Sequence, residues 1–277
     1  MNEPETFFET KDHQNLFFRV WQPAGHLKAA VCLVHGLGEH SGRYQHVAAA
    51  FNAAGVGVWG FDLRGHGKTP GKRGQVPHYD VMLDDIADAI DAAQEQFTGV
   101  PVFLYGHSMG GNLVLNYALR RKPALAGVIA TSPWIQLAFS PPDSQVRLAR
   151  LMNHLLPNLT QPNGLDVQAL AHDPEVVAAY QNDPLVHDRV SIRLSVEFLD
   201  AGEWALEHAA ELALPLLLVH GSADPITSAA ASQEFAARAG ELCTLKIWEG
   251  LYHETHNEPQ KEQVIAYNLE WLEQHLG

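Results

Sequence analysis

Cysteine and long apolar runs are scarce in this sequence. Only two of its 277 residues are cysteines, Cys32 and Cys243, and both lie within short apolar stretches. A secreted domain held together by disulfides is therefore excluded, and we expect two buried thiols in a reducing compartment. No window approaches the ~18 consecutive apolar residues that a membrane-spanning helix needs, so no such helix is predicted.

Basic side chains are also few. The chain carries 18 Lys and Arg against 32 Asp and Glu, a formal net charge of −14 at pH 7. This charge repels nucleic-acid phosphates, so no nucleic-acid partner is expected. If the protein meets a membrane, apolar contact must provide the attraction rather than a polybasic patch, and we expect that contact to be transient and made through the helical cap predicted at 134–188. The N-terminal residues do not resemble a signal peptide, so a cytoplasmic location is predicted.

Short apolar runs alternate along the chain with amphipathic helical patterns. Continuous apolar runs are typical of parallel strands buried on both faces. We predict such strands at 29–35, 56–61, 102–105, 127–132, 214–220 and 244–248. Residues 7–21 predict an antiparallel hairpin at a sheet edge, and helical periodicity covers 80–97, 228–239, 262–275 and the residues after Ser108. The expected fold is α/β, a mostly parallel central sheet with helices on both faces.

One segment breaks this alternation. Residues 134–188 contain no convincing strand, but they contain several prolines and a helical pattern at 146–156. We predict an inserted helical cap at 134–188 over the carboxyl edge of the sheet, with the core formed by 1–133 and 189–277. An apolar stripe in the cap either packs it onto the core or lines a ligand tunnel; its members are Leu148, Leu151, Met152, Leu155 and Leu156.

The stretch Gly106-His107-Ser108-Met109-Gly110 follows a predicted strand and precedes a helical pattern. It therefore matches G-x-S-x-G in the strand–turn–helix context that exposes a nucleophilic serine. The turn is tight enough to leave no room for side chains at the flanking positions, which explains the glycines. We predict Ser108 as a catalytic nucleophile, the alternative being a serine that only caps the helix.

A serine hydroxyl needs a base, and the base needs an acid that orients it. In hydrolases built on this turn the order along the chain is Ser, then Asp or Glu, then His. Asp224 follows the strand at 214–220, and His253 lies just beyond the strand at 244–248, so we predict these two, with His256 as the alternative base. Three rival carboxylates follow no strand: Asp183, Asp188 and Asp200.

Two backbone N–H groups should stabilise the oxyanion of the reaction. We assign them to Met109, directly after the nucleophile, and to Leu37 in the glycine-containing loop after the first buried strand. The match of residues 55–60 to G-x-G-x-x-G lies within a strand, and no Cys/His cluster has zinc spacing. Neither a cofactor nor a metal is therefore predicted.

With these motifs, the chain resembles the α/β-hydrolase superfamily, and within it the monoacylglycerol lipase and lysophospholipase group. The motifs are HGLGEHSGRY at 35–44, FDLRGHG at 61–67 and GHSMGG at 106–111. Cap stretches of the monoacylglycerol lipases are similar to 156–159 and 182–186. The resemblance implies an α/β-hydrolase fold, a triad of Ser108, Asp224 and His253, and an amphipathic cap over an acyl tunnel.

The function predicted is that of a serine hydrolase cleaving esters of a single fatty acyl chain, first of all monoacylglycerol. Its ligand is then a small lipid ester, and nothing indicates an obligate protein partner. The alternatives are a lysophospholipase, a general carboxylesterase, a proline-type aminopeptidase and a non-catalytic ligand receptor. An aminopeptidase needs carboxylates for the substrate's amino group, and the predicted cap offers Asp166, Asp173 and Glu175.

Overall fold

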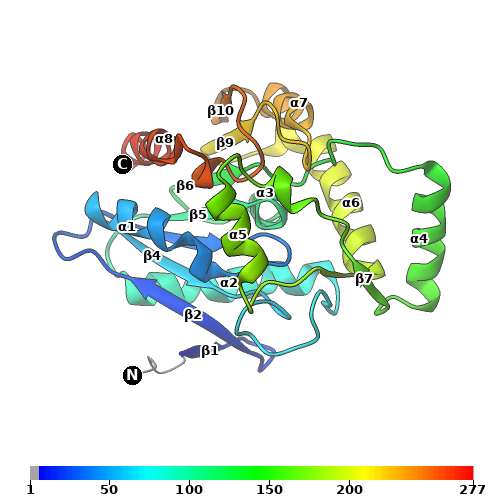
Figure 1. Cartoon of the computed structure of the whole chain (residues 1–277). Coiled ribbons are helices and arrows are strands. Elements are labelled where there is room, and N and C mark those ends of the chain that lie inside the picture. Colours follow the sequence, from blue (N-terminus) through cyan, green and yellow to red (C-terminus); the bar gives the residue numbers. More distant parts are fainter. Residues whose placement is uncertain (1–5, 277) are drawn as a thin grey trace.

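An eight-stranded sheet runs through the centre of the molecule, as the computed structural model of residues 6–276 shows (Figure 1). In sheet order the strands are β1 (Phe7–Glu9), β2 (Asn15–Trp21), β4 (Val56–Phe61), β3 (Ala29–Val34), β5 (Val102–His107), β6 (Gly127–Thr131), β9 (Leu216–Gly221) and β10 (Cys243–Trp248). Strands β4 to β10 are parallel in this order, while β1 and β2 form the antiparallel hairpin at one edge. The predicted α/β fold is therefore confirmed.

The strands lie close to where their apolar runs predicted them. One difference is β9, which begins at Leu216 instead of 214. Pro215 precedes it and lacks the N–H that a central strand donates to its neighbour. Another is β5, which continues to His107, the residue before the serine turn.

Helices cover both faces of the sheet, and the alternation of strand side chains explains how they are held. In β3, Ala29, Val31 and Leu33 pack toward α1 (Gln45–Ala53) and α8 (Lys261–Glu273). The intervening side chains of β3 point to the other face. That face is covered by α2 (Tyr79–Gln96), α3 (Met109–Arg121), α6 (Ile192–Glu207) and α7 (Ala229–Ala239). Burial of β3 on both faces explains why its run is continuously apolar.

Between β6 and α6 the chain makes the long excursion that was predicted as a cap. It contains α4 (Asp143–Leu155), β7 (Thr160–Pro162), α5 (Pro174–Asn182) and β8 (Arg189–Ser191). Figure 1 shows α4 at the rim of the molecule, outside α6. The expectation of no strand in this segment is wrong at β7, which pairs with β8 over three residues. Thr-Gln-Pro has no apolar pattern from which a strand could be predicted.

The cysteine prediction holds for one thiol only. Cys32 is fully buried in β3, whereas Cys243 is half-buried because it begins the edge strand β10. Both are free thiols, and partial burial raises the pKa of Cys243 to about 12. Among the helices of residues 6–276, none is long and apolar enough to cross a membrane.

Candidate active site

Ser108 lies between the end of β5 and the start of α3, in a backbone conformation that side chains rarely adopt. Its φ is +53°, in the left-handed region. A Cβ on Gly106 would lie 2.3 Å from the Gly110 oxygen, and one on Gly110 would lie 2.2 Å from the Val34 oxygen. Only glycine fits at both positions. The turn therefore holds a strained, half-buried serine at the N-terminus of a helix.

Asp224 and His253 come from two further strand ends and meet in a direct hydrogen bond. Asp224 follows β9, and His253 lies in the loop after β10. Nδ1 of His253 lies 2.7 Å from Oδ2 of Asp224, and both side chains are almost fully buried. Because Nδ1 faces the carboxylate, Nε2 is the imidazole nitrogen left for a reacting group.

Four further hydrogen bonds satisfy the Asp224 carboxylate. Its Oδ2 accepts from Oγ1 of Thr227 at 2.9 Å and from Nε2 of His220 at 3.0 Å. Its Oδ1 accepts the backbone N–H groups of Ile226 and Thr227. Burial disfavours the charged carboxylate, but the facing histidines outweigh it and hold the pKa of Asp224 well below its ordinary range. Asp224 is therefore ionised at neutral pH.

The contact with Asp224 also determines the pKa of the His253 imidazole. Burial of His253 favours its neutral form, yet the Asp224 carboxylate outweighs burial, so the pKa of His253 lies above its ordinary value. His253 is further held through its backbone oxygen, which accepts from Oγ of Ser132 at 2.7 Å. A buried imidazole that can be both neutral and stably protonated suits proton transfer near neutral pH.

The loop after β3 approaches Ser108 closely. A Cβ on Gly36 would lie 3.3 Å from the Ser108 Cβ. The N–H of Gly36 donates to Oε1 of Glu39 at 2.6 Å and is not available to a ligand, while the next residue, Leu37, lines the cavity beside Ser108. Met109 is the first residue of α3, where backbone N–H groups have no partner within the helix.

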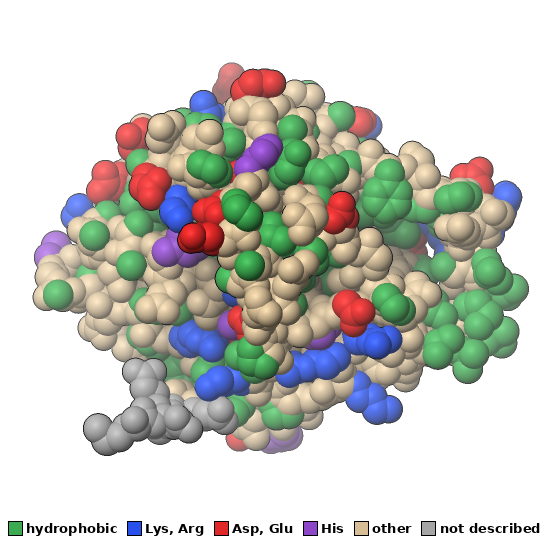
Figure 2. All heavy atoms as spheres, in the orientation of Figure 1, with side chains coloured by type: hydrophobic (Ala, Val, Ile, Leu, Met, Phe, Trp, Pro, Cys, Tyr) green, Lys and Arg blue, Asp and Glu red, His purple; other side chains and the backbone are tan. Residues whose placement is uncertain are grey.

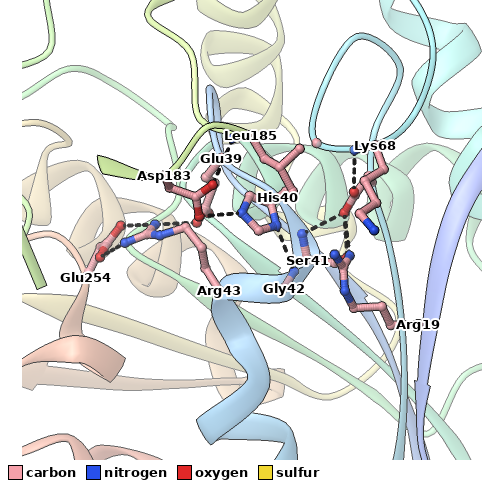
Figure 3. A network of polar contacts seen from close by, with 12 residues as sticks. Arg19, Glu39, His40, Ser41, Gly42, Arg43, Lys68, Asp183, Leu185 and Glu254 are labelled. Carbon is pink, nitrogen blue, oxygen red and sulfur yellow. Dashed lines mark hydrogen bonds and ion pairs between the residues drawn. The ribbon is translucent and has the colours of Figure 1, made fainter. Parts of the chain in front are cut away.

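A buried ionic network joins this loop to the loop that carries His253 (Figure 3). Arg43 donates to Oε2 of Glu39 at 2.5 Å and to both carboxylate oxygens of Glu254, 211 residues away, at 2.6 and 2.8 Å. Burial opposes the charge on Glu254, but Arg43 outweighs it and lowers the pKa of that carboxyl. The two loops are thus fixed to each other beside the Asp224–His253 pair.

The rival residues are engaged elsewhere. The ring of His256 stacks on Tyr44, with centroids 5.0 Å apart, and burial lowers its pKa to about 3. Each rival carboxylate has its own partner within residues 6–276: Asp183 pairs with His40, Asp188 with Arg189, and Asp200 with Arg150. The structure therefore brings together the predicted Asp224 and His253 and leaves the alternatives apart.

A cavity of about 840 Å³ opens between the sheet edge and the excursion after β6. Ser108 and His253 line it together, and most of its other walls are apolar, including Trp134, Leu170, Val190, Ile192 and Leu199. The stripe on and just after α4 is divided. Leu148 and Met152 line the cavity, although Leu148 is also 57% exposed, whereas Leu151, Leu155 and Leu156 do not line the cavity and are more than half exposed. The stripe was expected either to pack the cap onto the core or to line a ligand tunnel, and neither role describes all of its members.

Sequence reasoning missed several residues of this site. His220 lies four residues before Asp224 at the same strand end, and Thr227 lies three residues after it. Their short separation from Asp224 could have indicated that they contact it. Glu39 and Arg43 stood within the quoted HGLGEHSGRY motif without a role. The role of Glu254 could not be predicted from the sequence, because its partner Arg43 lies 211 residues away.

A serine in a strained turn, an oriented imidazole and an apolar cavity on this fold define a serine ester hydrolase. Comparison with known proteins specifies the class further. The family described as serine aminopeptidase, S33, matches residues 25–260. A monoacylglycerol lipase of Mycolicibacterium smegmatis is 35% identical over 94% of both chains. A crystal structure of Paleococcus ferrophilus monoacylglycerol lipase is 37% identical, with a TM-score of 0.85 over 94% of this chain and 99% of that one.

An abhydrolase domain-containing protein of Dictyostelium discoideum is 40% identical over 96% of this chain, which spans only 28% of that longer relative. The chain therefore belongs to the α/β-hydrolase family described as serine aminopeptidase, S33, and to its monoacylglycerol lipase group.

Proposed function

We propose that this enzyme hydrolyses monoacylglycerol to glycerol and a fatty acid. The observation that carries the proposal is the apolar cavity of about 840 Å³ that contains both Ser108 and His253. Pockets for one small ligand occupy roughly 300–1,000 Å³, so this cavity suits one acyl chain and a small alcohol. The relatives named monoacylglycerol lipase support the same substrate class.

The proposed reaction uses three side chains and two amides. Oγ of Ser108 attacks the ester carbonyl while Nε2 of His253 takes the hydroxyl proton, and Asp224 stabilises the resulting imidazolium. The N–H groups of Leu37 and Met109 bind the oxyanion. His253 then gives its proton to the departing glycerol oxygen, leaving an acyl ester on Ser108. Water, deprotonated by His253, releases the fatty acid and restores the serine.

We further propose that α4 makes transient apolar contact with the lipid surface that supplies the substrate. Figure 2 shows hydrophobic side chains gathered on the flank of the molecule where α4 lies. They include Leu151, Leu155 and Leu156, with exposed fractions of 58%, 67% and 52%. Clustered exposed apolar side chains of this kind mark a site of protein or membrane interaction. This contact would bring the mouth of an apolar cavity near dissolved acyl chains.

The aminopeptidase alternative has less support. Of the three carboxylates offered for it, only Asp166 lines the cavity, and its Oδ1 already accepts the N–H of Gln168. Asp173 caps the N-terminus of α5, and Glu175 lies in the first turn of that helix. The other acids on the cavity wall, Glu39 and Glu254, share Arg43.

A release assay over a panel of substrates tests the proposal. The panel is monoolein, oleoyl lysophosphatidylcholine, triolein, a short p-nitrophenyl ester and a proline p-nitroanilide, each with the wild type and with Ser108→Ala. We expect monoolein to have the highest kcat/KM of the natural lipids and triolein to be poor, because two further chains do not fit. Preference for lysophospholipid or for the proline amide would overturn the proposal.

A further inference from the structure

Glu258 is a carboxylate that the reaction described above does not use. It lies between the His253 loop and α8, and its side chain is completely buried. Oε1 accepts the backbone N–H of Tyr252 at 2.6 Å, and Oε2 accepts the backbone N–H of His172 at 3.0 Å. The Glu258 carboxylate thus connects Tyr252, the residue before His253, to His172, which lies 86 residues before Glu258 in the sequence.

The segment at 170–172, between β7 and α5, touches the His253 loop in two more ways. The N–H of Glu254 donates to the backbone oxygen of Leu170 at 2.7 Å. The ring of His172 stacks on Tyr252, with centroids 3.7 Å apart, and its Nδ1 lies 2.9 Å from Oε1 of Glu258. The residues on both sides of His253 are therefore tied to the same short segment.

Burying a carboxylate is expensive unless hydrogen bonds satisfy it, and bonds from N–H groups to a charged oxygen are stronger than neutral ones. Glu258 accepts two backbone N–H groups that belong to two different segments. An amide side chain has one acceptor oxygen and would present an NH₂ group to the second N–H. The position is therefore built for a carboxylate.

We propose that Glu258 is a positioning residue for His253, which it holds in place by tying the loop at 252–254 to the excursion segment at 170–172. The inference rests on the proposed role of His253 as the base. A misplacement of about 1 Å at a reacting group costs about 100-fold in rate, so a loop tether of this kind is kinetically important. Glu258 touches neither substrate nor Ser108 in this role and acts only through the loop.

The test is Glu258→Gln, which keeps the size of the side chain and removes one acceptor. Active sites are counted with a fluorophosphonate titrant, and kcat and KM are measured with a short p-nitrophenyl ester. We expect kcat per active site to fall at least about tenfold, KM to change less than about threefold, and the fluorophosphonate rate constant to fall by the same factor as kcat. Glu262→Gln, an exposed acid in the first turn of α8, is the matched control and should behave as wild type.

His172→Ala decides the matter if Glu258→Gln does not fold, because the His172 side chain is 44% exposed and its removal leaves the core intact. It should lower kcat in the same direction by a smaller factor. Where Glu258→Gln does fold, His172→Ala should add nothing in that background, since the two side chains form one unit. A merely structural role predicts a lower melting temperature with unchanged kcat per active site.

Wild-type kcat per active site in Glu258→Gln, or in His172→Ala where only that variant folds, would overturn the inference while leaving the proposed function intact. Failure of the wild type itself to cleave esters or to react with the titrant would instead overturn the proposed function.

Discussion

Asp224 and His253 form the central pair of the site, and the proposed nucleophile Ser108 lines the same cavity. Since each member of a triad prepares the next, Ser108→Ala and His253→Ala should each lower kcat by about 10⁴-fold or more. Asp224→Asn should also be severe, because it removes the acceptor that fixes the imidazole tautomer. His256→Ala should matter much less. Steady-state kinetics with monoolein measure all four, and a severe loss in His256→Ala with none in His253→Ala would reassign the base.

The pH dependence of the reaction tests the proposed role of His253 as the base. The base must be neutral to accept the Ser108 proton, and its pKa lies above the ordinary value of about 6.5. We therefore expect kcat/KM to fall on the acid side with a midpoint above pH ~6.5. Burial keeps the neighbouring His107 and His256 neutral by lowering their pKa values, so they should add no second step. A pH profile whose acid midpoint lies clearly below pH 6 would contradict this account.

The sequence predicted the local structure around the proposed catalytic residues, because that structure follows from residues adjacent in the chain. The strand–turn–helix context around Ser108 and the strands before Asp224 and His253 are visible along the chain. The support around them is not: Arg43 meets Glu254, and Glu258 meets His172, only because the fold brings distant loops together. The spacing of residues along the sequence does not indicate such long-range contacts, and in the sequence these four residues cannot be told from charged or polar residues on the surface.

At the scale of the element, the apolar pattern predicted where strands lie better than it predicted what the apolar face of a helix contacts. The run in β3 is apolar because both faces are buried, and its bounds were nearly right. The stripe on α4 is equally regular, yet some of its members line the cavity and others face outward. Periodicity shows that a helix has an apolar face, but what that face meets is decided by the rest of the molecule. The division into core and cap at residues 134 and 188 stays a prediction.

The exposed part of α4 gives a test of its own. Leu151→Gln with Leu155→Gln should weaken binding to phosphatidylcholine vesicles in co-sedimentation and lower kcat/KM for monoolein in those vesicles. Both side chains are exposed, so the melting temperature and the hydrolysis of a dissolved p-nitrophenyl ester should stay as in the wild type. Leu242→Gln, an exposed leucine far from α4 in sequence, is the control. Unchanged vesicle binding in the double variant would remove α4 from the proposal.

At the scale of the whole molecule, the net charge of −14 should bias the choice among lipids. Anionic lysophospholipids are repelled by the surface, whereas neutral glycerol esters are not, and salt screens this repulsion over about 10 Å at 0.1 M. The ratio of kcat/KM for monoolein to that for oleoyl lysophosphatidylglycerol should therefore be largest at low ionic strength and shrink as salt is added. A ratio independent of salt would show that the cavity, not the surface charge, sets the preference.

One measurement joins the nucleophile, the base and the cavity in a single result: labelling with a long-chain fluorophosphonate, followed by peptide mapping, in the presence of increasing monoolein. The account predicts one adduct, on Ser108, that monoolein suppresses in proportion to its concentration. The adduct should be absent in Ser108→Ala and form far more slowly in His253→Ala. An adduct on another residue, or labelling of Ser108 that monoolein does not reduce, would contradict the account.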